Sequence, residues 1–383
     1  MECVRPKEKI LIQRDCHKSV FSAATLGNID IEYIYPKYNE QFSLNIGIDI
    51  LELEKKLKEY PEIKAVVLTY PTYYGICCDI QEAAKIIHKY DRILIVDEAH
   101  GSHLNFLETL PIAAEKAGAD IVIQSTHKTL PALTQSSTLH VCSERINKEK
   151  LKKLLAMIQS SSPSYILMSS IENAIEYMEK QGKIRLGNNI EIIRKKTKQV
   201  ADRGIKVITK DIISNIKGFD FDETKIIISL DNIGISGNQL EEILRDKYKI
   251  QVEMSDMTYI NAFVTAADEP DEIEKLFDSI INIFESNIKN KKQNRQIKIE
   301  NIPKLEKSIS IRRAFYREDK KIKLVNSCNK IAADFIIPYP PGIPLVCPGE
   351  IINEKIITTL IRMQENNINI IGIDEGFIDI IDL

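Results

Sequence analysis

The first part of the chain alternates short apolar runs with longer stretches in which apolar residues recur at helical spacing. The strands predicted from the short runs are 9–13 (KILIQ), 31–35 (IEYIY), 65–69 (AVVLT), 92–96 (RILIV) and 121–123 (IVI). The helices predicted between them are 17–26, 51–60 and 81–90. Continuous apolar strands that alternate with helices are typical of a parallel sheet covered on both faces. We therefore expect an α/β domain with a mostly parallel sheet.

After Leu151 the pattern becomes helical. Apolar residues at 167, 171, 174, 175 and 178 predict one helix that stops at Gly182, and a second helix is predicted around 188–200. A strand at 225–230 and helices at 239–248 and 271–285 then indicate a smaller α/β unit. The polar run KNKKQNRQ at 289–296 predicts a linker. These changes predict three domains, 1–160, 161–290 and 291–383.

Bulk composition narrows the function classes. The chain has 383 residues and a formal net charge of -3, which gives no electrostatic reason to expect nucleic acid or an acidic membrane surface as a partner. Its seven cysteines are odd in number and contain no C-x-x-C pair, so neither a disulfide framework nor a cysteine-rich zinc site is expected. No apolar run is long enough for a membrane span, and the N-terminus lacks a signal-peptide core. The cytoplasm is the expected compartment.

Two predicted strand ends carry reactive side chains. The run RILIV leads to Asp97, and IVIQ leads to Ser125, His127 and Lys128. Ligands of open parallel sheets lie beyond the carboxyl ends of the strands, so these groups face the favoured crevice. A lysine amine and a carboxylate so placed suit pyridoxal phosphate, because the lysine forms a Schiff base and the carboxylate keeps the pyridine nitrogen protonated. Buried strand ends also carry such residues for capping, and the pair alone does not decide between these interpretations.

Longer strings carry a resemblance to a known family. They are RDCHKSVFSA (14–23), YPTYYGICCDI (70–80), VDEAHGSHLNF (96–106), ADIVIQSTHKTLPALTQSSTLHV (119–141) and YPPGIPLVCPGE (339–350). Together they resemble the ornithine/lysine/arginine decarboxylases, which have the aspartate-aminotransferase-like fold of pyridoxal-phosphate enzymes. The resemblance runs from about Lys7 through the C-terminal domain. It implies a large domain, a small α/β domain and a C-terminal decarboxylase domain.

The resemblance implies roles for individual residues. Lys128 resembles the Schiff-base lysine and Asp97 the partner of the pyridine nitrogen. His17 resembles the imidazole stacked on one ring face, and Ala99 would support the other face. The further cofactor contacts implied are Ser125, His127 and Thr72. Glu350 would face the cationic end of a basic substrate, or else stabilise a turn.

His100 and His103 have metal-like spacing, but no third ligand cluster accompanies them, so no metal site is predicted. The string VDEAH also matches a strand end of helicase-type ATPases. Those enzymes need an upstream phosphate loop, and this sequence has none.

The family pattern also implies a further N-terminal stretch with a phosphate-binding turn, which the sequence before Lys9 does not supply. We therefore expect an N-terminally truncated member. Three explanations stay open: the start site is misassigned, the N-terminal part is a separately encoded fragment, or the chain is a degenerate remnant.

The function expected from the resemblance is decarboxylation of lysine, ornithine or arginine to the amine and carbon dioxide, with pyridoxal phosphate as cofactor, as in polyamine biosynthesis. His127 or the released Lys128 would return the proton. A homodimer or higher oligomer is expected. The alternatives are an aminotransferase, and an inactive or split fragment that acts only with a partner chain.

Overall fold

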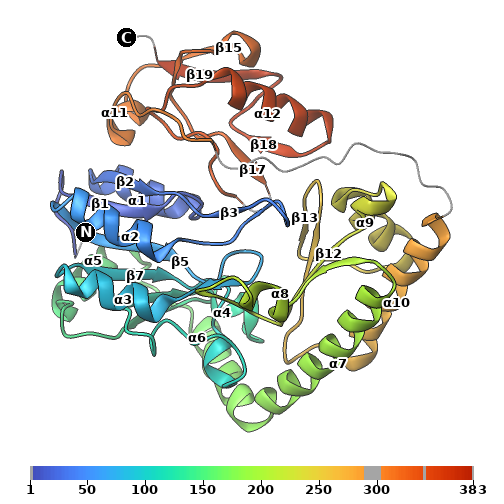
Figure 1. Ribbon diagram of the computed structural model, residues 1–383. Helices are drawn as coiled ribbons and strands as arrows, with labels where there is room; N and C mark the ends of the chain where they lie inside the picture. Colours follow the sequence, from blue (N-terminus) through green and yellow to red (C-terminus); the bar gives the residue numbers. More distant parts are fainter. Residues whose placement is uncertain (1–2, 289–302, 340–341, 382–383) are drawn as a thin grey trace. The chain divides into compact units, whose positions relative to one another are not determined.

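The computed structural model describes residues 3–288, 303–339 and 342–381. The predicted linker at 289–296 and the prolines at 340 and 341 lie outside these ranges. The chain forms two compact units, which are described separately. One contains Met1–Leu68, Ile87–Leu94 and Glu300–Leu383, and the other contains Thr69–Ile86 and Ile95–Ile299. Figure 1 labels the elements of both.

The first unit begins with parallel strands. Strand β1 (Lys9–Gln13) pairs in parallel with β2 (Asp30–Ile34) and with β5 (Ile63–Thr69). Helix α1 (Lys18–Gly27) connects β1 to β2, and α2 (Ile50–Glu59) precedes β5. The cap residue of α2 is Asp49, whose side chain accepts a hydrogen bond from Leu51 N. Between β2 and α2, the short strands β3 (Tyr38–Asn39) and β4 (Leu44–Asn45) form an antiparallel pair.

The C-terminal part of the same unit is a small α/β structure with its own apolar core. Strands β15 (Lys320–Lys323), β19 (Phe377–Ile381) and β16 (Ile331–Ala332) form an antiparallel sheet in that order. Strands β17 (Ile337–Tyr339) and β18 (Asn369–Ile371) pair separately. Helix α12 (Glu354–Glu365) buries Ile356, Ile357 and Leu360 in this core, while the short helix α11 (Ile311–Phe315) contacts α1.

The second unit contains the strands that end in the predicted site. Strand β7 (Ile93–Asp97), which belongs to this unit from Ile95 on, pairs in parallel with β8 (Ile121–Gln124), and β8 pairs antiparallel with β9 (Thr138–Val141). The one-turn helix α4 (Thr126–Thr129) follows β8 directly, and helix α3 (Ile80–Lys89) precedes β7. Strand β6 (Ile76–Cys78) pairs with β11 (Phe219–Phe221). Parallel pairing of the principal strands of both units agrees with the predicted sheet.

The rest of this unit is a smaller α/β structure. Its antiparallel sheet has the order β10 (Lys206–Ile208), β12 (Lys225–Ser229), β14 (Ile260–Phe263) and β13 (Met254–Ser255). The helices are α8 (Lys210–Ser214), α9 (Gly237–Ile243), which continues as a π-helical turn to Tyr248, and α10 (Pro270–Asn287). A single apolar core joins this sheet to α9 and α10.

One predicted helix boundary is wrong. After helix α5 (Lys148–Ile158) and a short loop, α6 (Tyr165–Tyr177), a π-helical turn (Met178–Gly182) and α7 (Lys183–Asp202) follow one another without a break. Gly182 therefore lies inside a long helix and does not stop it. A Cβ atom there would lie 2.6 Å from Met178 Sδ and 2.9 Å from Tyr177 Cε1, so glycine is needed for packing space and not for a left-handed turn. Figure 1 shows α7 running beside α10, which it contacts.

Candidate cofactor site

The two predicted strand ends meet at one edge of the sheet in the second unit. The parallel register places Asp97 of β7 opposite Ile123 of β8, and Glu98 N donates to Ile123 O at 2.8 Å. Both strands therefore end at the same level, with α4 following directly from β8. Lys128 Nζ, on α4, lies 3.2 Å from Nε2 of His100 in the loop after β7. The group after β7 and the group after β8 thus form one cluster.

Asp97 is held by its own loop. Its Oδ1 accepts a hydrogen bond from Ala99 N at 3.2 Å, and its carbonyl oxygen accepts one from Tyr70 N at 3.0 Å. Asp97 and Ala99 are both partly exposed, as residues that contact a ligand must be. The backbone contact through Ala99 fixes the orientation of the carboxylate.

The residues of α4 and the residue before it are also ordered by contacts with the backbone. His127 Nδ1 lies 2.7 Å from Ser136 O. Because a carbonyl oxygen can only accept, Nδ1 carries the hydrogen and Nε2 of the neutral ring keeps its lone pair. Ser125 precedes the helix, and its carbonyl oxygen accepts from Lys128 N at 2.9 Å. The Lys128 side chain itself is exposed.

Thr72 lies in the tight turn of the YPTYYG string. Its hydroxyl accepts from Ile76 N at 3.0 Å, and its own N–H donates to Ile76 O at 2.9 Å. Thr72 is buried, and this pair of bonds stabilises the turn before β6. Its predicted contact with the cofactor stays a prediction.

Glu98, the residue after Asp97, anchors the loop of the site in the core through buried hydrogen bonds, which could not be predicted from the sequence. Its carboxylate is completely buried and accepts from Ala114 N at 2.7 Å and from Gln124 Nε2 at 2.6 Å. Burial raises the pKa of Glu98 well above its ordinary value, although these two donors oppose the shift. A Cβ atom on Gly101 would lie 2.4 Å from Glu98 Cγ, so the loop after Asp97 closes tightly over this side chain.

His100 lies between two lysines, which sequence reasoning also missed. Its Nδ1 is 3.3 Å from Nζ of Lys225, the first residue of β12, which is fully buried. The burial of Lys225 could not be predicted from the sequence, because a lysine at the start of an apolar strand is usually exposed to solvent. His103 instead lies 3.2 Å from Asp222 Oδ1 through Nε2. Among the described residues no group of three or more potential metal ligands occurs.

Two predicted site residues belong to the first unit. His17 is exposed and caps α1, where its Nδ1 accepts from Ser19 N at 3.3 Å. Glu350 is fully buried, and its Oε2 accepts from Arg14 Nη2 at 3.1 Å and from Cys347 N at 2.8 Å. These contacts correspond to the turn-stabilising alternative for Glu350. The roles of His17 and Glu350 toward cofactor and substrate stay predictions.

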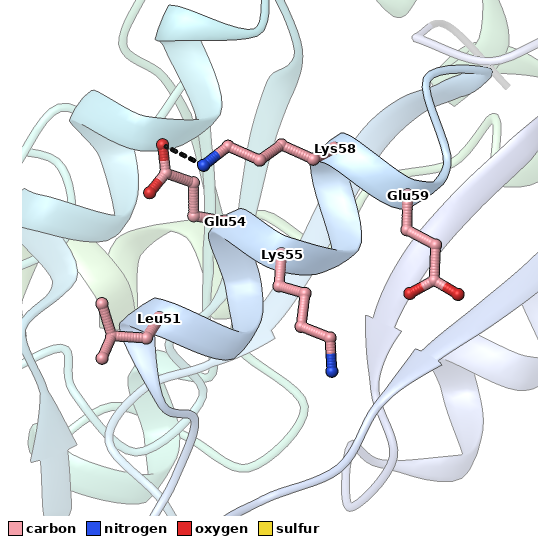
Figure 2. A pocket seen from close by; sticks show the side chains of 5 residues that line it. All are labelled: Leu51, Glu54, Lys55, Lys58 and Glu59. Atoms are coloured by element: carbon pink, nitrogen blue, oxygen red, sulfur yellow. Dashed lines mark ion pairs between the residues drawn. The ribbon is translucent and has the colours of Figure 1, made fainter.

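Two surface hollows on the described part of the chain lie away from the predicted cofactor residues. Figure 2 shows one on α2, lined by Leu51 and four charged residues, among them the Lys58–Glu54 pair at 3.5 Å. Solvated pairs of this kind contribute little and have no special chemistry. A second hollow, of about 370 Å³, is lined by Met168, Ile171, Glu172 and Ile175 of α6. Neither includes a predicted cofactor residue.

The donor set of the second unit fits pyridoxal phosphate. The exposed Lys128 side chain is available for the aldehyde of the cofactor. The Asp97 carboxylate, oriented by Ala99 N–H, is available for the pyridine nitrogen. Ala99, which would support the ring, has only a methyl side chain. Ser125 and His127 are the remaining polar candidates beside the lysine. In the described ranges, no helix combines the length and apolarity needed to cross a membrane.

Comparisons with known proteins agree with this chemistry. The family model described as "Orn/Lys/Arg decarboxylase, major domain" matches residues 1–271, and "Orn/Lys/Arg decarboxylase, C-terminal domain" matches 290–373. The arginine decarboxylase of Halalkalibacterium halodurans is 34% identical over 371 residues, which cover 96% of this chain and 74% of that protein. The arginine decarboxylase of Bacillus subtilis is 30% identical over 383 residues, covering 98% and 77%.

Solved structures show the same fold. The lysine decarboxylase of Francisella novicida superposes with a TM-score of 0.83 at 22% identity, covering 100% of this chain and 67% of that one. The pyridoxamine-pyruvate aminotransferase of Mesorhizobium loti has a TM-score of 0.58 at 14% identity, covering 75% of both chains. The predicted aminotransferase-like fold is therefore confirmed, as is the resemblance to a family of amino-acid decarboxylases. The chain belongs to the Orn/Lys/Arg decarboxylase family.

Proposed function

We propose that this chain decarboxylates a basic amino acid, lysine, ornithine or arginine, with pyridoxal phosphate bound at Lys128. The observation that carries the proposal is the meeting of the two strand ends, with Lys128 Nζ 3.2 Å from His100 Nε2 and the oriented carboxylate of Asp97 on the neighbouring parallel strand. Membership of the decarboxylase family supports the reaction class. The substrate side chain is left open among the three.

Each residue has a definite task in this proposal. Asp97, held by the Ala99 N–H, keeps a proton on the pyridine nitrogen, since a nearby carboxylate favours the charged form of a base. The cofactor supplies an electron sink for the charge that develops at the substrate Cα when carbon dioxide leaves. Lys128 holds the aldehyde between turnovers. His127, with its Nδ1–H bonded to Ser136 O, has Nε2 available to carry a proton to the product.

The first experiment is to add pyridoxal phosphate to the purified chain, reduce with borohydride and map the labelled peptide. Attachment to Lys128 supports the proposal, and labels scattered over exposed lysines such as Lys150 and Lys153 would contradict it. Incubation with lysine, ornithine or arginine then identifies the products. An amine with carbon dioxide is expected, whereas a keto acid would indicate an aminotransferase.

Replacing the lysine tests the reaction directly. Lys128→Ala should lower turnover by about a thousandfold or more, because it removes the group that holds the cofactor. Lys150→Ala, on the exposed face of α5, is the matched control and should retain parental turnover. If Lys128→Ala decarboxylated as fast as the parent, Lys128 could not have this role. If the parent chain were inactive and acquired activity only with an added partner chain, the split-fragment alternative would replace the proposal.

A second copy of the chain is the proposed partner. Tyr165, Ile166 and Met168 at the start of α6 are 76%, 73% and 54% exposed, respectively. Large exposed apolar side chains grouped on one helix are typical of an association surface. Self-association through this face of α6 accounts for their exposure.

A further inference from the structure

One imidazole connects two lysine amines in the second unit. Lys128 Nζ lies 3.2 Å from His100 Nε2, and Lys225 Nζ lies 3.3 Å from His100 Nδ1. The three residues come from different elements: α4, the loop after β7, and the start of β12. The proposed function uses Lys128 alone and gives no task to Lys225.

The two lysines differ in their surroundings. Lys128 is exposed, whereas Lys225 is 2% exposed and lies with Nζ 4.0 Å from the centre of the Phe263 ring. Burial lowers the pKa of Lys225 to about 8. Asp222 and Glu253 oppose that shift, and the charge of Lys128 adds to it. His100 and Tyr73 also face Lys225. The centre of the Tyr73 ring is 5.9 Å from Lys225 Nζ.

The position of Lys225 is enforced by its neighbours. Its N–H donates to Asp222 O at 3.1 Å. Asp222 Oδ1 is in turn held by Thr224 Oγ1 at 2.7 Å and His103 Nε2 at 3.2 Å. Gly75 has φ +78°, and a Cβ atom there would lie 2.7 Å from Lys225 Cγ, so the YPTYYG turn closes against the lysine stem. Burying the Lys225 amine lowers the stability of the fold. The contacts of Asp222 and Gly75 nevertheless hold this amine beside His100.

Proton counting restricts the charge of the cluster. A neutral imidazole has one N–H donor and one lone pair, and an ammonium group can only donate. If both lysines were ammonium groups, one of them would face the N–H of the ring. Both hydrogen bonds therefore require at least one of the two lysines to be a neutral amine, and when the pair holds one extra proton, one lysine is an ammonium and the other a neutral amine. Two such arrangements exist, and they differ in which lysine holds the extra proton.

We propose that Lys225 and His100 form a proton relay that takes a proton from Lys128. In one direction, an N–H bond of Lys128 breaks while Nε2 of His100 gains the proton, and Nδ1–H breaks while Nζ of Lys225 gains it. The imidazole changes tautomer, the total charge is unchanged, and Lys128 becomes a nucleophilic amine. The reverse transfer returns the proton to Lys128. The inference rests on the proposed function, since it assigns Lys128 as the lysine that must react as an amine; Lys225 acts through His100 and is a positioning residue.

The relay can be tested on the full chain without cofactor or substrate. Formaldehyde and cyanoborohydride methylate free amines, and peptide mass spectrometry measures the rate at Lys128 relative to exposed Lys153 in the same digest. The parent is compared with Lys225→Met, Lys225→Arg and His100→Gln between about pH 6.5 and pH 9.5. Arginine keeps a cation of similar length but cannot exchange the proton. Circular dichroism checks that each variant is folded.

The relay predicts that all three variants lower the relative rate at Lys128 near neutral pH by about tenfold, because each removes the internal acceptor for the Lys128 proton and a general base of this kind contributes at least that factor. The double variant His100→Gln/Lys225→Met should be no slower than either single variant, since both interrupt one path. If Lys225→Met labelled Lys128 at the parental rate, the relay would not exist. If Lys225→Arg did so while Lys225→Met did not, charge alone would explain the effect and the relay would be overturned. Failure of cofactor attachment in the parent would refute the proposed function separately, because this assay does not depend on it.

Discussion

Arg14 is the largest side chain among those that the first unit buries completely. Its guanidinium donates to Pro344 O at 2.6 Å, to Leu345 O at 3.0 Å and to Glu350 Oε2 at 3.1 Å. It also lies over the rings of Phe21 and Tyr33, 5.5 Å and 5.2 Å from their centres. The RDCHKS and VCPGE strings are thus joined by one ion pair, which accounts for Arg14 in the first and Glu350 in the second.

Removing the carboxylate of this pair should be costly. Glu350→Gln should lower the free energy of unfolding by about 3–5 kcal/mol, because it leaves a buried guanidinium without its counter-charge. The double variant Arg14→Met/Glu350→Leu should recover much of that loss. Urea unfolding measures both, and Glu365→Gln at the exposed end of α12 is the control, with no measurable change expected. Unchanged stability of Glu350→Gln together with a raised KM for the basic amino acid would instead favour the predicted substrate contact.

Lys225 should make stability depend on pH in the alkaline range. Its pKa is lowered from 10.5 to about 8 in the folded chain, so between these values the unfolded chain binds more protons than the folded one. Stability contributed by this residue therefore rises with pH across that window. The unfolding free energy of the parent minus that of Lys225→Met should increase by about 2 kcal/mol between about pH 8 and about pH 9.5. A difference that stays constant over this range would show that burial does not shift the pKa.

At the scale of elements, the two glycines of the α6–α7 helix should respond in opposite ways to alanine. Gly187→Ala should raise the free energy of unfolding by about 0.5–1 kcal/mol, because alanine favours the helix and its Cβ would meet only Leu107 Cδ2, at 3.9 Å. Gly182→Ala should lower it, because the gain in propensity is smaller than the cost of displacing Met178 and the Tyr177 ring. Thermal unfolding of the two variants measures this. Equal stabilisation by both would mean that the π-helical turn relaxes freely.

The elements that the sequence predicts well are those with a strong local pattern. KILIQ forms β1 over the predicted residues, and the amphipathic stretch 51–60 forms α2 with a shift of one residue. The end of α6 was mispredicted because a glycine in a helical pattern gives the same signal whether it caps a helix or makes room for a neighbouring ring. Only the packing of Tyr177 distinguishes these cases.

The candidate site divides in the same way. That Asp97 and Lys128 lie at neighbouring strand ends could be predicted, because parallel strands bring their carboxyl ends together; their roles toward a cofactor stay predictions. Glu98, Lys225 and Arg14 could not, since each acts through a partner that is distant in sequence or hidden in the core. Lys225 and its partner His100 are 125 residues apart. The predicted domain boundaries at 160/161 and 290/291 stay a prediction.

For the whole molecule, the α6 face provides a test of association. Met168→Glu should weaken self-association by about ten- to a hundredfold, because burial of a methionine side chain contributes about 1.5–3 kcal/mol. Light scattering over a range of concentrations measures the dissociation constant. Leu51→Glu is the matched control: Leu51 is 78% exposed, but it lies beside the charged side chains of α2 in Figure 2. A parent that remains monomeric at all concentrations would contradict the proposed partner.

The contacts of Arg14 also bear on how the chain folds while it is being made. Its two carbonyl acceptors are 330 and 331 residues further along the chain. Synthesis at about 5–20 residues per second therefore leaves the guanidinium without them for roughly 20–70 s after Arg14 is incorporated. The buried surroundings of the Arg14 guanidinium are therefore completed only after residues 344 and 345 have been synthesised.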